Sequence, residues 1–274
     1  MTVDSPLVLD DVEAQLQHIV KRHGFKNPEI TFSTGSAIGD GFIGVTSAIS
    51  LKDADKELKI FAKVAPTVES FRTSLNIRQI FLSEIYFYEN VYSTLSTFYV
   101  DKMGVPLKIA PESYQTSTEE MKEMILMEDL KDAGFVQQDK GVVMNREHLS
   151  MVIMTYAKYH ATSLALRDQK PDVFGAVVKN LTNETAEMFD KLGVDKLFIE
   201  GFQDAISCFD ENKDSEIVDK LGKACDRFIA MMREKETVVS EYSTFIHGDC
   251  WSGNMMFKYK VNIEDCIFSL YNRL

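Results

Sequence analysis

The chain has 274 residues, 45% of them hydrophobic and 11% aromatic, which is enough apolar material for a core in one large domain or two lobes. Its 30 basic and 42 acidic residues leave a net charge of −12, which argues against nucleic acid and anionic membranes as partners. Four cysteines without a Cys-x-x-Cys pair, no signal-peptide pattern and no apolar run near the roughly 20 residues of a membrane span indicate a cytoplasmic protein, and no protein partner is predicted.

The N-terminal region predicts one helix followed by a small antiparallel sheet. Asp10 can cap the helix, with Glu13 three residues later, and Gly24 can end it. The apolar side chains expected on its buried face are Val12, Leu16, Ile19 and Val20. Strands with hairpin connections are then indicated at residues 29–33, 44–51 and 58–65.

A glycine-rich stretch, residues 34–44, separates the first two expected strands and has four glycines in eleven residues. Glycine lets the backbone approach a phosphate closely, and successive N–H groups in such a turn form an anion-binding nest. Ser36, Gly39 and Gly41 are therefore candidate phosphate-binding residues. Such a stretch is a weak signal by itself, and an ordinary hairpin loop is the alternative.

Lys63 stands inside an apolar strand, where an unpaired charge is costly. Strand alternation places the apolar residues Phe61 and Ala65 on the same face as Lys63 and the other apolar residues of the strand on the opposite face. Neither face therefore looks exposed to solvent. A helix is expected from 68 to 95, and Glu84, 21 residues after Lys63, interrupts its apolar stripe. In kinases a strand lysine that binds phosphates is held by a glutamate of the following helix. Lys63 and Glu84 match that pair in order and spacing, although each alone is typical of a surface charge.

The remainder of the chain is expected to be mostly helical after one more strand. Residues 123–130 predict the last strand of the sheet, and Asn145 can cap the helix that follows. That helix is expected to bury His160, as a hydrogen-bonded core residue rather than a catalytic one, together with Leu149, Val152, Ile153, Tyr156 and Leu164. Two or three further helices are expected through 185–209 and 215–236, the last with inward-facing Ile217, Leu221, Ala224, Phe228 and Met231.

A catalytic-loop spacing follows, in which His247, Asp249 and Asn254 match the His-x-Asp-x-x-x-x-Asn pattern of kinases. In that pattern the Asp accepts the proton of the attacking hydroxyl and the Asn helps to hold Mg²⁺. In protein kinases this position is an Arg that binds the phosphorylated activation segment. Gly248 stands here instead, and its presence favours small-molecule substrates. One alternative is a structural His–Asp pair before a turn. The other is a metal hydrolase with Cys250 as a third ligand, but zinc sites use recurring ligand spacings that are not visible here.

With Trp251 and Phe257 included, this stretch resembles the His-Gly-Asp-x-Trp-x-x-Asn-x-x-Phe signature of the choline-kinase-like family that includes the insect ecdysteroid kinases. The resemblance covers about residues 30–268. It implies an α+β, two-lobed protein-kinase-like fold. Residues 1–130 would form a nucleotide-binding lobe with an antiparallel sheet, and residues 131–274 an incomplete helical lobe with the catalytic loop.

The resemblance implies transfer of the γ-phosphate of ATP, with Mg²⁺, to a hydroxyl of a small acceptor such as an ecdysteroid-like steroid or a choline-like amino alcohol. Asp249 is then the catalytic base and Asn254 a magnesium ligand. Lys63 orients the phosphates and is held by Glu84.

The sequence Leu-Met-Glu-Asp-Leu at residues 126–130 resembles the family segment that links the two lobes and whose backbone binds the adenine edge. This adds Glu128 and Leu130 to the expected nucleotide site. The residues alone fit a plain strand end equally well.

One family motif is not matched. The family has a strand ending in Asp-Phe-Gln, whose Asp is the second protein ligand of the metal, whereas here the similar strand 263–268 is followed by Ser269. Asp265 lies inside the strand, roughly 10 Å out of place at about 3.3 Å per residue. A truncated gene model or splice form is the expected explanation, and a catalytically impaired, nucleotide-binding pseudokinase-like protein is the alternative function.

Overall fold

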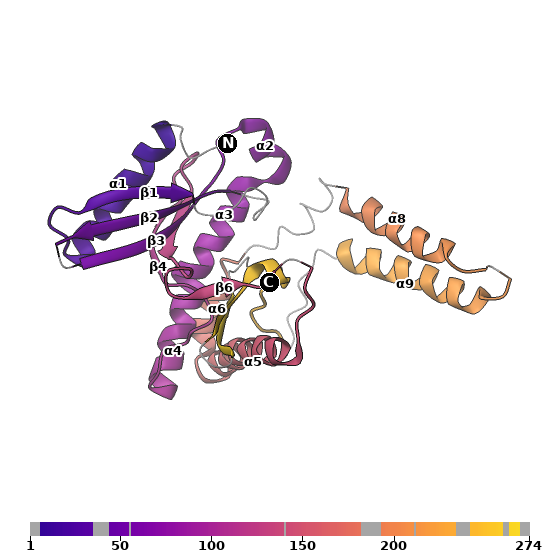
Figure 1. Ribbon diagram of the computed structural model, residues 1–274. Coiled ribbons are helices and arrows are strands. Elements are labelled where there is room, and N and C mark those ends of the chain that lie inside the picture. The colour runs from indigo at the N-terminus through magenta and orange to yellow at the C-terminus, as the bar shows by residue number, and fades with distance from the viewer. Residues whose placement is uncertain are drawn as a thin grey trace.

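The computed structural model describes residues 6–34, 44–54, 56–139, 141–181, 193–210, 212–233, 242–259 and 263–268, with residues 6–9, 34, 232–233 and 263–268 described by their backbone only. An antiparallel sheet forms the N-terminal part (Figure 1) and consists of β1 (Glu29–Thr34), β2 (Val45–Asp53), β3 (Lys56–Val64), β4 (Ser113–Ser117) and β5 (Met124–Glu128). The strand order is β1-β2-β3-β5-β4. The predicted α+β class, with an N-terminal antiparallel sheet followed by helices, is confirmed.

Strand β4 was not expected from the sequence, because its segment is polar apart from Tyr114. It lies at the edge of the sheet and pairs only with β5 among the described strands. An edge strand needs apolar side chains on one face at most, and here Tyr114 supplies the buried one. The predicted strand 123–130 corresponds to β5, whose side chains are buried on both faces and therefore give a clear apolar run.

Helix α1 (Pro6–His23) covers one face of this sheet. Val12, Leu16 and Ile19 are buried there, in a cluster with residues of the sheet that include Ile49, Ile60, Ala62 and Leu126. The predicted cap at Asp10 is wrong, because the helix begins four residues earlier and Asp10 lies within it. Pro6 is suited to a first helical turn, where its missing N–H has no partner to lose.

Residues 69–103 form a chain of helices whose middle part lies against the other face of the sheet. These helices are α2 (Glu69–Leu75), α3 (Ile77–Tyr86), the π-helical segment η1 (Phe87–Tyr92) and α4 (Ser93–Met103). The single helix expected over 68–95 is thus interrupted at Asn76, whose φ of 51° is left-handed. Asn tolerates this conformation better than most residues, so the break separates α2 from α3 at little cost.

The C-terminal part consists of helices and a second, three-stranded sheet (Figure 1). Its strands are β6 (Phe135–Gln137), β7 (Met255–Tyr259) and β8 (Ile263–Phe268), in the order β6-β7-β8. The 3₁₀ turn η2 (Ser252–Asn254) immediately precedes β7. The described helices are α5 (Arg146–Gln169), α6 (Pro171–Val178), α8 (Val194–Ser207) and α9 (Ser215–Arg233).

Helix α5 has the predicted N-cap but a different buried face. The Asn145 side chain accepts a hydrogen bond from the His148 backbone N–H at 2.9 Å. Leu149 and Ile153, expected to be buried, are 48% and 66% exposed. Val152 is buried as predicted, and the other buried residues are Thr155, Tyr159, Thr162, Ser163 and Leu166. The face is rotated because Thr and Ser pack inward: Thr155 and Thr162 bond carbonyls one turn back, and Ser163 bonds the Phe245 backbone N–H.

His160 is half-buried, and the hydrogen bond expected for it is missing at Nε2, which is buried without a partner among the described residues. Burial lowers the pKa of its imidazole, so the neutral form is favoured. Its ring lies beside those of Tyr156 and Tyr159. His160 is therefore an aromatic packing partner on α5.

Helices α8 and α9 form a hairpin that projects away from the two sheets (Figure 1). Phe228 of α9 packs against Phe198 and Phe202 of α8, with ring centroids 4.8 and 6.2 Å apart. Ile217 and Met231, expected to face inward, are 43% and 61% exposed. Ala224 is exposed as well, so the prediction is wrong for these three residues, because α9 packs against α8 along one narrow face.

The largest cluster of buried apolar side chains includes residues of both parts of the chain, among them Phe87, Ile125, Tyr159, Phe245 and Phe257. Apolar packing is thus continuous from α3, η1 and β5 to α5 and β7. Within the described residues, every helix is too short or too polar to cross a bilayer.

Candidate functional site

Lys63 and Glu84 form a buried ion pair, with Nζ and Oε2 2.5 Å apart. Strand β3 alternates as expected, so that Ile60, Ala62 and Val64 face the α1 side while Lys63 faces α3. The two side chains are 12% and 3% exposed. The Phe81 ring lies 5.5 Å from Nζ, on the same helix as Glu84. Lys63 and Glu84, which are 21 residues apart in the sequence, thus pair a strand lysine with a helix glutamate.

Burial raises the pKa of Glu84, while the charge and hydrogen bond of Lys63 oppose this rise. Replacing Lys63 with Met removes both opposing contributions, so the pKa of Glu84 rises further. Native Glu84 then binds a proton at pH values where the unfolded chain does not, so the stability of the variant falls as the pH rises. We expect Lys63→Met to be closest to wild type near about pH 5 and progressively less stable towards about pH 8.

Urea unfolding across this pH range measures the effect. Lys59→Met is the matched control, because Lys59 lies on the same strand and pairs with exposed Glu57. A difference between Lys63→Met and wild type that does not change with pH would show that Glu84 is not the titrating group.

The glycine-rich stretch ends beside Lys63. Ser36, Gly39 and Gly41 lie outside the described residues. Gly44, the next described residue, has a φ of 117°, and a Cβ there would lie 3.4 Å from the Phe81 ring and 3.5 Å from Cγ of Lys63. Only glycine adopts this φ readily. The stretch that connects β1 and β2 therefore returns to the sheet next to the buried ion pair.

The predicted catalytic loop, residues 247–254, is organised around Asp249. Asn254 Nδ2 donates hydrogen bonds to the Asp249 carbonyl oxygen at 3.0 Å and to Oδ2 at 2.8 Å. The Asp249 backbone N–H donates to Nδ1 of buried His247 at 3.1 Å, so this ring nitrogen carries no proton. Gly248 between them has a φ of 78°, which explains glycine at this position.

Asn254 is oriented so that one oxygen is left for a ligand. Both groups that it bonds on Asp249 are acceptors, so its amide nitrogen must face them. Oδ1 has no hydrogen-bond partner in the described part of the chain. Mg²⁺ is usually bound by one or two protein oxygens together with phosphates and water. The described residues contain no cluster of three His, Cys, Asp or Glu side chains suited to a metal.

Trp251, the only tryptophan in the sequence, covers Gly253. A Cβ at position 253 would lie 2.4 Å from ring atoms of Trp251, so Gly253→Ala must displace the indole. Because the ring is already 44% exposed, we expect it to move outward and its fluorescence emission to shift to longer wavelength. Gly222→Ala is the control, since a Cβ there has nothing within 4 Å. An unchanged emission spectrum in Gly253→Ala would contradict this arrangement of the loop.

The sheet-to-helix crossover contains Glu128 and Leu130. The Glu128 backbone N–H donates to the Glu112 carbonyl at 2.8 Å, so it is already used within the protein. The Leu130 backbone N–H has no partner among the described residues, whereas the Leu130 carbonyl accepts from Phe135. Of the two, Leu130, which is itself 6% exposed, is therefore the one whose N–H is not used among the described residues.

Strand β8 runs towards Asn254. Phe268 pairs with Met255, the residue after Asn254, so β8 ends beside the catalytic loop. Asp265 pairs with Lys258, three residues back from that end, which puts its backbone roughly 10 Å away at about 3.3 Å per residue. The backbone register therefore agrees with the expectation that Asp265 does not replace a carboxylate at the end of the strand.

One contact to the loop was missed from the sequence. The Gln137 side-chain amide donates a hydrogen bond to the carbonyl oxygen of Gly253. Gln137 belongs to β6, a strand of three residues that is too short to leave a periodic pattern. It ties the catalytic loop to the neighbouring strand.

Comparison with known proteins gives one match. The family model described as the ecdysteroid kinase-like family matches residues 39–269, a range that includes β3, α3, the crossover and the loop around Asp249. Neither the curated proteins nor the solved structures that were searched contain a match to the chain.

Proposed function

We propose that this chain, which belongs to the ecdysteroid kinase-like family, transfers the γ-phosphate of ATP to a hydroxyl group of a small molecule. The observation that carries the proposal is the buried 2.5 Å pair of Lys63 and Glu84 beside the end of the glycine-rich stretch. A buried lysine held by a carboxylate has its ammonium fixed in place, which suits the orientation of phosphate groups.

The proposed reaction uses Asp249 as the base. The acceptor oxygen attacks the γ-phosphorus as its proton passes to the Asp249 carboxylate, and the bond from the γ-phosphorus to the bridging oxygen breaks to release ADP. Asn254 holds the Asp249 carboxylate in place through Nδ2 and offers Oδ1 to the metal. Mg²⁺, when bound, neutralises charge on the phosphates. Leu130 offers its backbone N–H to the adenine edge.

The acceptor class belongs to this proposal, as an ecdysteroid-like steroid or a choline-like amino alcohol. The experiment supplies Mg·ATP to the purified chain with a polyhydroxylated ecdysteroid or with choline, and measures ADP formation and the mass of the acceptor. Acceptor-dependent ADP with an acceptor heavier by one phosphoryl group is the expected result. A cytosolic location, expected from the scattered cysteines, is likewise part of the proposal.

A second function is nucleotide binding without turnover. It is favoured by the end of β8, which lies beside Asn254 and is followed by Ser269 rather than by a carboxylate. Phosphoryl transfer depends mostly on positioning and on metal electrostatics, so one missing ligand would lower the rate strongly. ATP binding without transfer to either acceptor would support this function over the first.

A further inference from the structure

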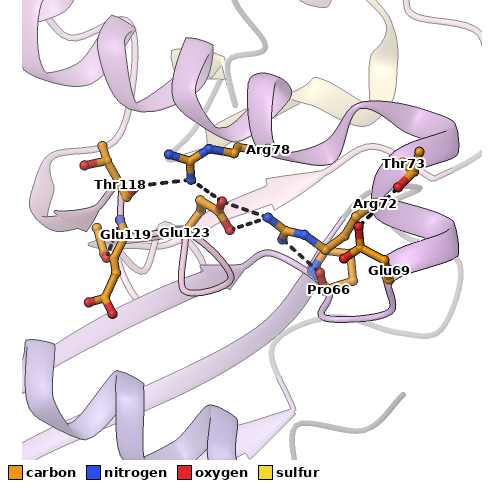
Figure 2. Close-up of polar contacts among 9 residues, drawn as sticks. Pro66, Glu69, Arg72, Thr73, Arg78, Thr118, Glu119 and Glu123 are labelled. Carbon is orange, nitrogen blue, oxygen red and sulfur yellow. Dashed lines mark hydrogen bonds and ion pairs between the residues drawn. The ribbon is translucent and has the colours of Figure 1, made fainter.

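A buried charged cluster lies at the other end of the helix that carries Glu84 (Figure 2). Glu123, immediately before β5, is fully buried and accepts hydrogen bonds from Nη2 of Arg72 at 2.8 and 3.0 Å. It also accepts one from Nη1 of Arg78 at 2.6 Å. Arg72 belongs to α2 and is 7% exposed, and Arg78 belongs to α3. One carboxylate thus joins two helices to the sheet.

The cluster is also tied to the end of β3. Arg72 Nη1 donates to the Pro66 carbonyl at 3.1 Å, and the Ala65 backbone N–H donates to the Glu123 carbonyl at 2.9 Å. Figure 2 shows Arg72 reaching both Glu123 and Pro66. Burial alone would raise the pKa of Glu123, but the hydrogen bonds from the two arginines outweigh it and lower the pKa. Glu123 is therefore a fixed anion between two cations.

The cluster and the Lys63–Glu84 pair both connect α3 to the sheet, the pair at β3 and the cluster at Glu123 before β5. Lys63 lies two residues before Ala65 on the β3 side, and Glu84 lies six residues after Arg78 on α3, which is about 9 Å along a helix. Between the two ties, Ala65, Ile77 and Phe81 form a small apolar cluster. Helix α3 is thus held against the sheet at two polar points with apolar packing between them.

We propose that Glu123, gripped by Arg72 and Arg78, is a positioning residue that holds α3 where Glu84 can reach Lys63. The proposal rests on the proposed function, in which this ion pair orients ATP. The two arginines do not form an anion-binding site of their own, because Glu123 already occupies the donors that face it.

The test measures the reactivity of Lys63 without any nucleotide. A brief pulse of acetic anhydride acetylates neutral amines, and mass spectrometry compares Lys63 with exposed Lys220 of the same molecule. In the wild type the Lys63 amine is 12% exposed and held 2.5 Å from the Glu84 carboxylate, so loss of this partner frees the amine to react. We expect Glu84→Gln to raise Lys63 acetylation on the order of tenfold, as for the loss of one hydrogen bond between charged groups. Glu123→Gln should give most of this increase, and the double variant no more than Glu84→Gln alone.

Two further variants separate positioning from loss of stability. Leu16→Ala weakens the core on the opposite face of the sheet and should leave Lys63 acetylation at the wild-type level. Arg78→Gln removes only the partly exposed ion pair with Glu123 and should raise Lys63 acetylation less than Glu123→Gln does. It keeps the test available if Glu123→Gln does not fold. Wild-type acetylation in the folded glutamine variants, or an equal increase in Leu16→Ala, would overturn the proposal.

Adding Mg·ATP distinguishes the two proposals. If Glu123→Gln increases Lys63 acetylation and Mg·ATP protects Lys63 in the wild type, both are supported. If the increase occurs but Mg·ATP gives no protection, the positioning role stands and the proposed function fails.

Discussion

Replacing Asp249 with alanine is expected to lower the rate of acceptor phosphorylation by about 10²–10⁴-fold, the usual contribution of a general base. ATP affinity should change little, because the Asp249 carboxylate is assigned to the acceptor hydroxyl. The Asn254 amide holds the carboxylate, and the hydrogen bond from the Asp249 backbone N–H to His247 fixes the backbone beside it. The measurement is the kcat for acceptor-dependent ADP formation beside the dissociation constant for Mg·ATP.

Two neighbouring variants serve as controls for the loop itself. Asp249→Asn keeps an oxygen that can accept from Asn254 but cannot take a proton, so it should be as inactive as the alanine variant. Cys250→Ala changes the next, exposed residue and should retain wild-type kcat. An unchanged kcat in Asp249→Asn would show that another group acts as the base.

The second large effect is expected at Lys63. A hydrogen bond to a charged group contributes roughly 1.5–3 kcal/mol, so Lys63→Met should weaken Mg·ATP binding by about 10–100-fold. The Mg·ATP affinity should be measured by calorimetric titration at a pH low enough that Glu84 of the variant is protonated. The variant then has no unpaired buried carboxylate and is compared with wild type in its folded state.

Lys59→Met is again the control for this measurement. Lys59 is four residues away on β3 and pairs with Glu57 at the exposed end of the strand, so its loss should leave ATP affinity within about twofold of wild type. Equal affinities in Lys63→Met and wild type would exclude Lys63 from the nucleotide site.

The N-terminal sheet and its ion pair could be predicted because local patterns coincide with burial. Strands β2, β3 and β5 have apolar runs or alternations, and a lysine or glutamate within such a run is visible as an exception. The order of Lys63 and Glu84 along the chain was enough to pair them, since a strand and the following helix pack side by side. Their roles in catalysis stay predictions.

The elements that were missed share polar sequences. Strand β4 has a single large apolar side chain among its five residues, and β6 has three residues, so neither produces a period. The buried face of α5 was placed wrongly because Thr155, Thr162 and Ser163 satisfy their hydroxyls within the helix or with Phe245. Sequence patterns count such residues as polar although their hydrogen bonds permit burial.

The cluster of Arg72, Arg78 and Glu123 could not be found from the sequence. An arginine near a helix start and a glutamate before a strand both read as surface charges. Only the return of the chain after α4 brings Glu123 beside β3 and between the two arginines. Long-range ion pairs of this kind depend on topology, which local spacing does not encode.

The most direct test of nucleotide binding is a thermal-unfolding titration of the purified 274-residue chain with ATP, in the presence and absence of Mg²⁺. A ligand that binds only the native state stabilises it by mass action, by about 2.7 kcal/mol at a concentration of about one hundred times its dissociation constant. The unfolding temperature rises as a result. We expect one cooperative transition that rises with ATP and rises further when Mg²⁺ is present. A cooperative transition that stays constant up to millimolar Mg·ATP would contradict a nucleotide site at Lys63 and Asn254.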